Sequence, residues 1–234
     1  MKRVIPAITF IDNSTYVTRQ FKKRIDGGDL LNSIRFFSES DADELIVSFP
    51  NFNKSESNSL LIKSVIETCF VPLNIAGAVR DFESARQLFG LGLDKVSITL
   101  SIKNIQLMQE ISEMYGAQAL TAVVKINRND DVNCSLLTEQ LLESGAGEVL
   151  LIDIEKEGTG TGLDLSYLEK FKNFSLKMPL LVRGGCSRYT EINSILDLNW
   201  IDGIVAASIF SCTPDGESIL LNYERGLWLD NDLQ

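Results

Sequence analysis

The sequence predicts a single (β/α)8 TIM barrel with a two-fold half-barrel repeat. Three observations favour this fold: strand-like and helix-like segments alternate, one similarity recurs at half the chain length, and the length suits one barrel. With 234 residues, 44% of them hydrophobic, the chain can bury one large core. We therefore expect one domain, 1–234, with half-barrels of approximately 1–115 and 116–234.

Short apolar, β-branched runs recur along the chain and have the character of buried strands. A polar turn and a segment with helical apolar spacing follow each run, which is typical of a parallel sheet with crossover helices. The eight strands are expected to begin at Val4, Glu44, Leu73, Lys95, Leu120, Glu148, Leu180 and Gly203. Eight such strands indicate a closed barrel.

Several helical segments begin just after an aspartate in the N-cap position, where a carboxylate accepts hydrogen bonds from free backbone N–H groups. These aspartates are Asp29, Asp81 and Asp164. Two longer polar segments, Ile11 to Gly28 and Phe49 to Asn58, follow the first and second strands. We expect both to be loops at the C-terminal mouth of the barrel.

The internal repeat has three matching pairs of segments, separated by 107, 108 and 104 positions. The pairs are 72–80 with 179–187, 93–96 with 201–204, and 44–47 with 148–151. Similar offsets indicate duplicated half-barrels, although chance similarity between strand segments is the alternative.

Composition excludes several classes of function. The chain has no histidine, which excludes Ser-His-Asp and Cys-His catalysis and zinc sites that use histidine. A net charge of -10 disfavours nucleic acid and anionic membranes as partners. The cysteines lack metal-type spacing and are expected to be free thiols: Cys69, Cys134, Cys186 and Cys212.

The sequence also lacks an apolar run of about 18 residues and a signal-peptide pattern. We expect a cytoplasmic protein with no metal and no cofactor.

A glycine pair follows the seventh predicted strand and small residues follow the eighth, which is the usual position of a phosphate site in such barrels. The segments are Arg183-Gly184-Gly185-Cys186 and Val205-Ala206-Ala207-Ser208. Tight turns that need glycine for a positive φ angle are the alternative explanation. The equivalent first-half segments are Ala76-Gly77-Ala78 and Ser97-Ile98-Thr99. Alanines replace the flanking glycines in the first of them and add Cβ atoms where an anion would approach the backbone, which predicts a weaker site or none.

Over almost its full length the chain resembles the cyclase subunit of the imidazole glycerol phosphate synthase family. The matching segments are 3–7, 28–29, 43–45, 94–98, 116–119, 145–148, 158–159, 184–185 and 206–208. The sister phosphoribosyl isomerase family shares the half-barrel plan but fits 145–148 less well. The resemblance implies a phosphate site that includes Gly158, Gly184, Gly185, Ala207 and Ser208, with Arg183 as a possible addition.

The chain departs from this family at the mouth. The family's two catalytic aspartates, which serve as general acid and base, are matched here by Thr9 and Lys125. A threonine hydroxyl does not titrate near neutral pH, and a lysine is a base only if burial lowers its pKa strongly. The loop from Ile126 to Cys134 is shorter than in the family, and Arg183 replaces a small residue, where it would bind an anion or fill the pocket.

The opposite end of the barrel keeps the family's pattern. Four charged residues there correspond to the family's ammonia gate: Arg3, Glu44, Lys95 and Glu148. The resemblance also implies contacts with a glutaminase through Asp43, Asp94 and Gln118. Charged strand starts that merely face solvent are the alternative explanation.

The leading hypothesis is a cyclase-like subunit that docks and activates a glutaminase as a heterodimer and conducts its ammonia. The combination of a retained floor and missing catalytic carboxylates resembles the divergent cyclase-like subunits associated with amidotransferases of surface-polysaccharide synthesis. This resemblance implies that the ammonia passes to a sugar amidotransferase that makes amidino sugars. A second hypothesis is an active cyclase or lyase of histidine biosynthesis in which Lys125 acts with a mouth carboxylate, such as Asp12, Asp153 or Glu157. A third is a non-catalytic barrel that binds a phosphorylated small molecule.

Overall fold

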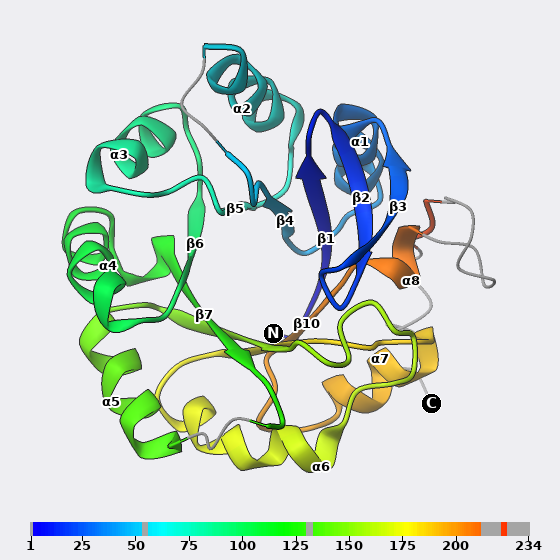
Figure 1. Cartoon of the computed structure of the whole chain (residues 1–234), viewed down its shortest axis with the longest axis vertical. Coiled ribbons are helices and arrows are strands. Elements are labelled where there is room, and N and C mark those ends of the chain that lie inside the picture. The colour runs from blue at the N-terminus through cyan, green and yellow to red at the C-terminus, as the bar shows by residue number, and fades with distance from the viewer. Residues whose placement is uncertain (1, 53–55, 130–132, 212–220, 224–234) are drawn as a thin grey trace.

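The computed structural model describes residues 2–52, 56–129, 133–211 and 221–223. Parallel strands surround a central axis and helices form an outer ring around them (Figure 1). The chain proceeds once around this ring from its N-terminus to its C-terminus (Figure 1). The predicted (β/α)8 barrel is therefore confirmed.

The barrel strands begin at the predicted residues, or within one residue of them. They are β1 (Arg3–Ile11), β4 (Leu45–Ser48), β5 (Leu73–Ala76), β6 (Lys95–Thr99), β7 (Leu120–Ile126), β8 (Glu148–Asp153), β9 (Leu180–Arg183) and β10 (Gly203–Ala206). Each pairs in parallel with the next, and β10 pairs with β1 to close the barrel. We call the N-terminal ends of these strands the floor and their C-terminal ends the mouth.

The segment after β1 is a β-hairpin and not the loop that the sequence was expected to form. β2 (Ser14–Arg19) and β3 (Lys23–Gly28) pair antiparallel, and β2 continues the sheet from β1. Asp12 and Asn13 make the two-residue turn into β2 with φ angles of 50° and 67°. Aspartate and asparagine tolerate this left-handed conformation, so the turn is of the kind that joins twisted strands.

The helices cover the outside of the barrel and come from the segments with helical apolar spacing. They are α1 (Leu30–Glu39), α2 (Glu56–Thr68), α3 (Phe82–Gly90), α4 (Ile102–Tyr115), α5 (Cys134–Ser144), α6 (Leu165–Leu168), α7 (Tyr189–Leu196) and α8 (Ser208–Ser211), with 3-10 turns η1 (Ala117–Ala119) and η2 (Glu169–Leu176). Because α2 begins at Glu56, the loop expected from Phe49 to Asn58 is shorter than predicted, and 53–55 lie outside the described residues.

All three predicted N-caps are confirmed. The carboxylate of Asp29 accepts a hydrogen bond from the backbone N–H of Asn32, and that of Asp164 accepts one from Tyr167. Asp81 forms a reciprocal capping box with Ser84. These carboxylates satisfy backbone donors that no helical carbonyl can reach.

Side chains inside the barrel form a core separate from the larger one between strands and helices. The inner core contains Ile5, Ala7, Ile46, Val123, Leu150, Ile152, Leu181 and Val205. Successive side chains of a strand alternate between its two faces. Inward positions therefore recur every second residue, and this spacing fixes which polar residues face the axis.

The two halves of the barrel repeat one unusual contact at the floor. The carboxylate of Asp94 accepts a hydrogen bond from the backbone N–H of Leu73 at 2.9 Å, and Asp202 does the same for Leu180 at 2.9 Å. Both pairs belong to the segments that match between the halves. The contact agrees with a half-barrel division near residue 115, where α4 ends, and that division stays a prediction.

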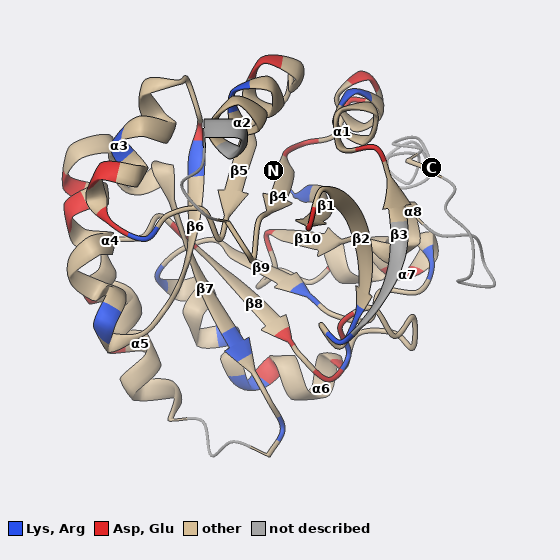
Figure 2. Cartoon of the chain, turned by 45° about the horizontal axis from the view of Figure 1, so that its top comes forward, with Lys and Arg blue, Asp and Glu red and all other residues tan. Residues whose placement is uncertain are grey.

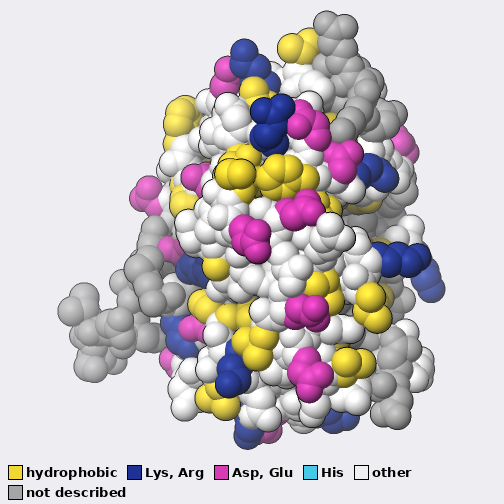
Figure 3. Space-filling model, turned by 90° about the vertical axis from the view of Figure 1, so that its left-hand side faces the viewer, with side chains coloured by type: hydrophobic (Ala, Val, Ile, Leu, Met, Phe, Trp, Pro, Cys, Tyr) yellow, Lys and Arg dark blue, Asp and Glu magenta, His cyan; other side chains and the backbone are white. Residues whose placement is uncertain are grey.

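The outer wall formed by the α3–α5 side of the barrel carries small apolar groups among acidic side chains (Figure 3). Large exposed apolar residues on α4 and α5 are Ile102, Met114, Leu136 and Leu142. In the part of the chain that the structure describes, no helix has the length and apolar character needed to cross a membrane.

Candidate functional site

Four charged side chains meet at the floor, on the barrel axis. The guanidinium of Arg3 contacts Glu44 at 2.7 Å and Glu148 at 2.6 Å, and the ammonium of Lys95 contacts the same carboxylates at 3.1 and 2.8 Å. Positive and negative groups therefore alternate in a closed ring, which we call the floor ring. The structure brings together all four residues predicted for the gate, and they do not face solvent separately.

The floor ring is largely removed from water. The side chains of Glu44 and Glu148 are 3% and 7% exposed, while Lys95 and Arg3 are 14% and 21% exposed. Burial by itself would raise the pKa of Glu148, but attraction to Lys95 and Arg3 outweighs it and holds this pKa below its ordinary value. Burial likewise opposes the charge of Arg3, yet Glu148 and Glu44 raise its pKa. Each charge thus depends on its neighbours.

A layer of polar side chains lies directly above the ring and was not predicted. The amide of Asn74 donates to Glu44 at 3.4 Å and to the hydroxyl of Thr121 at 3.0 Å. Thr121 donates to Glu148 at 2.6 Å, and Ser97 donates to the Asn74 carbonyl at 2.8 Å. All three residues are buried, so a path of polar groups leads from the ring into the barrel.

The residues predicted for the glutaminase interface also lie at the floor, and two of them accept hydrogen bonds from the backbone. Asp43 accepts a hydrogen bond from the backbone N–H of Val4 at 2.8 Å, as Asp94 does from Leu73. Gln118, on η1, is exposed, and its amide donates a hydrogen bond to the Tyr115 carbonyl at 3.2 Å. Gln118 is therefore the best position at which to disturb docking without disturbing the barrel.

The mouth contains a pocket of about 340 Å³ that descends toward the polar layer. Thr9 and Lys125, which were predicted to occupy the family's catalytic positions, both line it, and Ser97 lies near its base. Figure 2 shows the basic residues near the tips of β7 and β9 and the acidic residue at the tip of β8. No aspartate or glutamate lines this pocket among the described residues, so it lacks a carboxylate for acid–base catalysis.

The β2–β3 hairpin is fastened over this pocket by Glu157, which is 2% exposed. The carboxylate of Glu157 accepts hydrogen bonds from the Thr18 hydroxyl at 2.8 Å and the Phe21 backbone N–H at 3.0 Å. It also pairs with Arg183 at 3.2 Å. The ring of Phe21 lies 5.6 Å from the Lys125 ammonium and 5.8 Å from the Arg183 guanidinium. Phe21 and this role of Glu157 were not predicted.

The carboxylates suggested as partners of Lys125 do not serve that purpose. Glu157 is occupied by the hairpin, and Asp153 is 1% exposed and accepts hydrogen bonds from the backbone N–H groups of Glu155 and Lys156. Asp12 lies in the hairpin turn and does not line the pocket. None of these three carboxylates is therefore available as the acid–base partner of Lys125 that an active cyclase or lyase would need.

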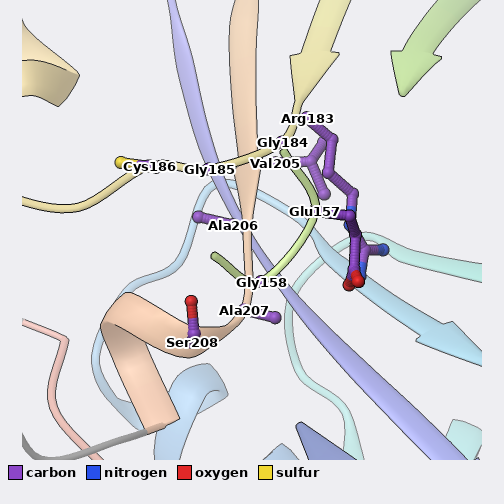
Figure 4. A pocket seen from close by; sticks show the side chains of 10 residues that line it. All are labelled: Glu157, Gly158, Arg183, Gly184, Gly185, Cys186, Val205, Ala206, Ala207 and Ser208. Atoms are coloured by element: carbon purple, nitrogen blue, oxygen red, sulfur yellow. The ribbon is translucent and has the colours of Figure 1, made fainter. Parts of the chain in front are cut away.

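The predicted phosphate segments line one small cavity, as Figure 4 shows. It measures about 20 Å³, which is room for about one water molecule. The lining residues are Glu157, Gly158, Arg183, Gly184, Gly185, Cys186, Val205, Ala206, Ala207 and Ser208. In Figure 4 the Arg183 side chain lies beside Glu157, in agreement with their ion pair. The side chain of Arg183 therefore occupies part of this region, and Glu157 balances its charge.

Glycine is required in this cavity for reasons of packing. Gly184 has a φ angle of 137°, and a Cβ there would lie 2.8 Å from the carbonyl oxygen of Asp153. Gly185 has a φ of 84°, and its Cβ would lie 2.7 Å from the Gly162 carbonyl. These contacts account for the glycines without a ligand, so phosphate binding here stays a prediction.

The cysteines of the described residues, Cys69, Cys134 and Cys186, are free thiols, and Cys212 lies outside that part of the chain. Burial, assisted by the charge of Glu191, raises the pKa of Cys186 to about 12. The thiol is therefore protonated at neutral pH and is a poor nucleophile.

Comparison with known families agrees with this architecture. The model of the histidine biosynthesis protein family matches residues 3–213. The chain belongs to this family. Within the histidine biosynthesis family, a Leptospira borgpetersenii protein named "Putative imidazole glycerol phosphate synthase subunit HisF" is 27% identical, over 96% of this chain and 95% of its own.

Other relatives in the family are similar over comparable lengths. The Pseudomonas aeruginosa protein "Putative imidazole glycerol phosphate synthase subunit hisF2" is 28% identical over 95% of both chains. "Imidazole glycerol phosphate synthase subunit HisF" of Chlorobium limicola is 28% identical, over 89% of this chain and 90% of its own. The match to the histidine biosynthesis family thus covers both the floor and the mouth.

Proposed function

We propose that this chain is the barrel subunit of a glutamine amidotransferase complex. A glutaminase docks on the floor, is activated there, and releases ammonia that passes the floor ring and travels through the barrel to the mouth. The observation that carries this proposal is the closed ring of Arg3, Glu44, Lys95 and Glu148 around the axis. Four buried charges contribute little net free energy to the stability of a barrel, because desolvation offsets much of their attraction. Stability alone is therefore a weak explanation for the ring.

The layers above the ring support a route for a small polar molecule. Ammonia that passed the ring would meet Asn74 and Thr121, then Ser97, and then the mouth pocket that Ser97 lines. Each of these side chains can donate or accept a hydrogen bond. In the structure the ring is closed by direct ion pairs, so passage requires a side chain of the ring to move.

The residues at the mouth favour delivery of ammonia over the ring-closure chemistry of the family. Thr9 replaces an acid–base group, and the described lining of the mouth pocket contains no carboxylate. We propose that the ammonia acceptor is a sugar, modified by a sugar amidotransferase of surface-polysaccharide synthesis. The resemblance to cyclase-like subunits of such systems supports this acceptor.

Docking on the floor is tested by Gln118→Lys, which adds a long cation at an exposed position. Purified chain is mixed with a candidate glutaminase subunit from the same organism, and complex formation is measured by size-exclusion chromatography with light scattering and by titration calorimetry. A one-to-one complex is expected, and Gln118→Lys should weaken it by about tenfold or more, because the interface would bury a long cation without a matching anion.

The matched control is Gln106→Lys on the wall helix α4, where Gln106 is exposed and away from the floor. It should bind the glutaminase as the wild type does. Absence of a complex, or equal weakening by both variants, would contradict docking on the floor.

A further inference from the structure

We propose that the mouth pocket binds a small polyhydroxylated anion, a sugar acid or a sugar phosphate, with Lys125 as the anchor for its anionic group. This inference rests on the proposed delivery of ammonia to the mouth, because it assigns the chemical class of the acceptor held there. It concerns a pocket distinct from the small cavity beside Gly184 and Gly185.

The charge of the pocket favours an anion. Its lining includes two cations, Lys125 and Arg183, and no acidic residue among those described. Arg183 is paired with the buried Glu157, whereas Lys125 is exposed and has no ion pair with a described residue. Lys125 is thus the cation available to a ligand, since a lysine ammonium carries three donors.

The remaining lining favours hydroxyl groups and a ring. Thr9, Ser48 and Thr99 place hydroxyls around the pocket, and Asn51 adds an amide. The ring of Phe21 covers one side and lies 5.6 Å from the Lys125 ammonium, so a ligand held by Lys125 would contact its face. Hydroxyl partners beside an aromatic face suit the polar edges and apolar faces of a sugar.

The size and depth of the pocket fit an acceptor of this class. A volume of about 340 Å³ lies within the range of about 300–1,000 Å³ that is typical of small-molecule sites. Lys125 lies near the C-terminal end of β7, while Ser97, Ile46 and Leu150 lie deeper in the pocket. An anion on Lys125 would therefore leave the other end of the ligand pointing down the barrel, toward the ammonia route.

The test uses glucuronate, glucose 6-phosphate and uncharged glucose as probes, with isothermal titration calorimetry on the full chain. At least one anionic probe should bind, and glucose should bind about tenfold or more weakly, because a hydrogen bond to a charged group is at stake. Preference for glucuronate identifies a carboxylate ligand, and preference for glucose 6-phosphate identifies a phosphate ligand. Equal binding of glucose, or no binding of either anion, would overturn the proposal.

Two pairs of variants locate the site. Lys125→Gln should weaken binding of the anion by about tenfold or more, whereas Lys170→Gln should not. Lys170 is a suitable control because it is also exposed and lies 5.0 Å from an aromatic ring, that of Tyr167, outside the pocket. Phe21→Ala should weaken binding, and Phe70→Ala, at a residue 77% exposed, should not.

Equal affinity in Lys125→Gln and the wild type would refute the anchor. No glutaminase takes part in these measurements. Failure of anion binding is therefore distinguishable from failure of the proposed complex.

Discussion

Glu148→Gln is expected to lower the free energy of unfolding by about 3 kcal/mol, the range seen when one partner of a buried ion network is removed. Glutamine keeps the size of the side chain but not its charge. Arg3 and Lys95 would then share Glu44 alone, and a net positive charge would stay in a poorly hydrated floor. Chemical denaturation, monitored by circular dichroism, measures this loss.

The matched control is Glu143→Gln, at an exposed glutamate on α5, which should change stability by less than about 0.5 kcal/mol. Similar losses in both variants would show that the floor ring has no special role in stability.

The pH dependence gives the same residue a second test. The pKa of Glu148 is lower in the folded chain than its ordinary value of 4.5, so the ionised form stabilises the fold. This contribution is complete above the unfolded pKa and is lost as pH falls through the lower folded value. The stability difference between wild type and Glu148→Gln should be constant at neutral pH and shrink below about pH 4.5. A difference that grows on acidification would contradict a lowered pKa of Glu148 in the folded chain.

Gly158→Ala is expected to destabilise the chain by about 3 kcal/mol through overpacking and backbone strain. Gly158 has a φ angle of 65°, and a Cβ there would overlap the carbonyl oxygen of Thr18, which is backbone of the hairpin. Either the hairpin or the segment around Glu157 must shift. Hydrogen exchange should therefore be faster at the amides of Gln20 and Phe21, which bond to Glu157.

Gly160→Ala separates packing from strain. Gly160 has a nearly identical φ angle of 62°, but a Cβ there has nothing within 4 Å. This variant should lose only about 1 kcal/mol, the cost of a left-handed alanine, and should leave the hairpin amides protected. Equal effects of the two variants would show that the hairpin does not rest on Gly158.

The strand order could be predicted because it depends on local patterns, whereas the floor ring was predicted from the resemblance to the cyclase family and agrees with the geometry of a closed barrel. Charged residues at the starts of apolar strands converge wherever parallel strands close into a barrel, and Arg3, Glu44, Lys95 and Glu148 all begin or directly precede such strands. The polar layer could also have been predicted, from the alternation of side chains along a strand. Ser97 lies two residues after Lys95, on the same face of its strand, and its inward position follows from that spacing.

Other features depend on contacts between distant segments, which one sequence does not reveal. The hairpin contains residues that favour strands from Thr15 to Thr18, yet the polar character of the longer segment led to the prediction of a loop. The position of Phe21 over Lys125 follows from how Glu157 holds the hairpin. The structural role of Asp43 and Asp94 likewise depends on backbone N–H groups of neighbouring strands.

The most direct measurement is the initial rate of glutamate release by the candidate glutaminase subunit, with and without a saturating amount of this chain. If docking on the barrel activates the glutaminase, the turnover of the glutaminase should rise about fivefold or more, which is the lower end of the usual coupling between two sites. At the same concentrations, Gln118→Lys should give little of this increase. An unchanged rate in a mixture where the complex has formed would contradict the account.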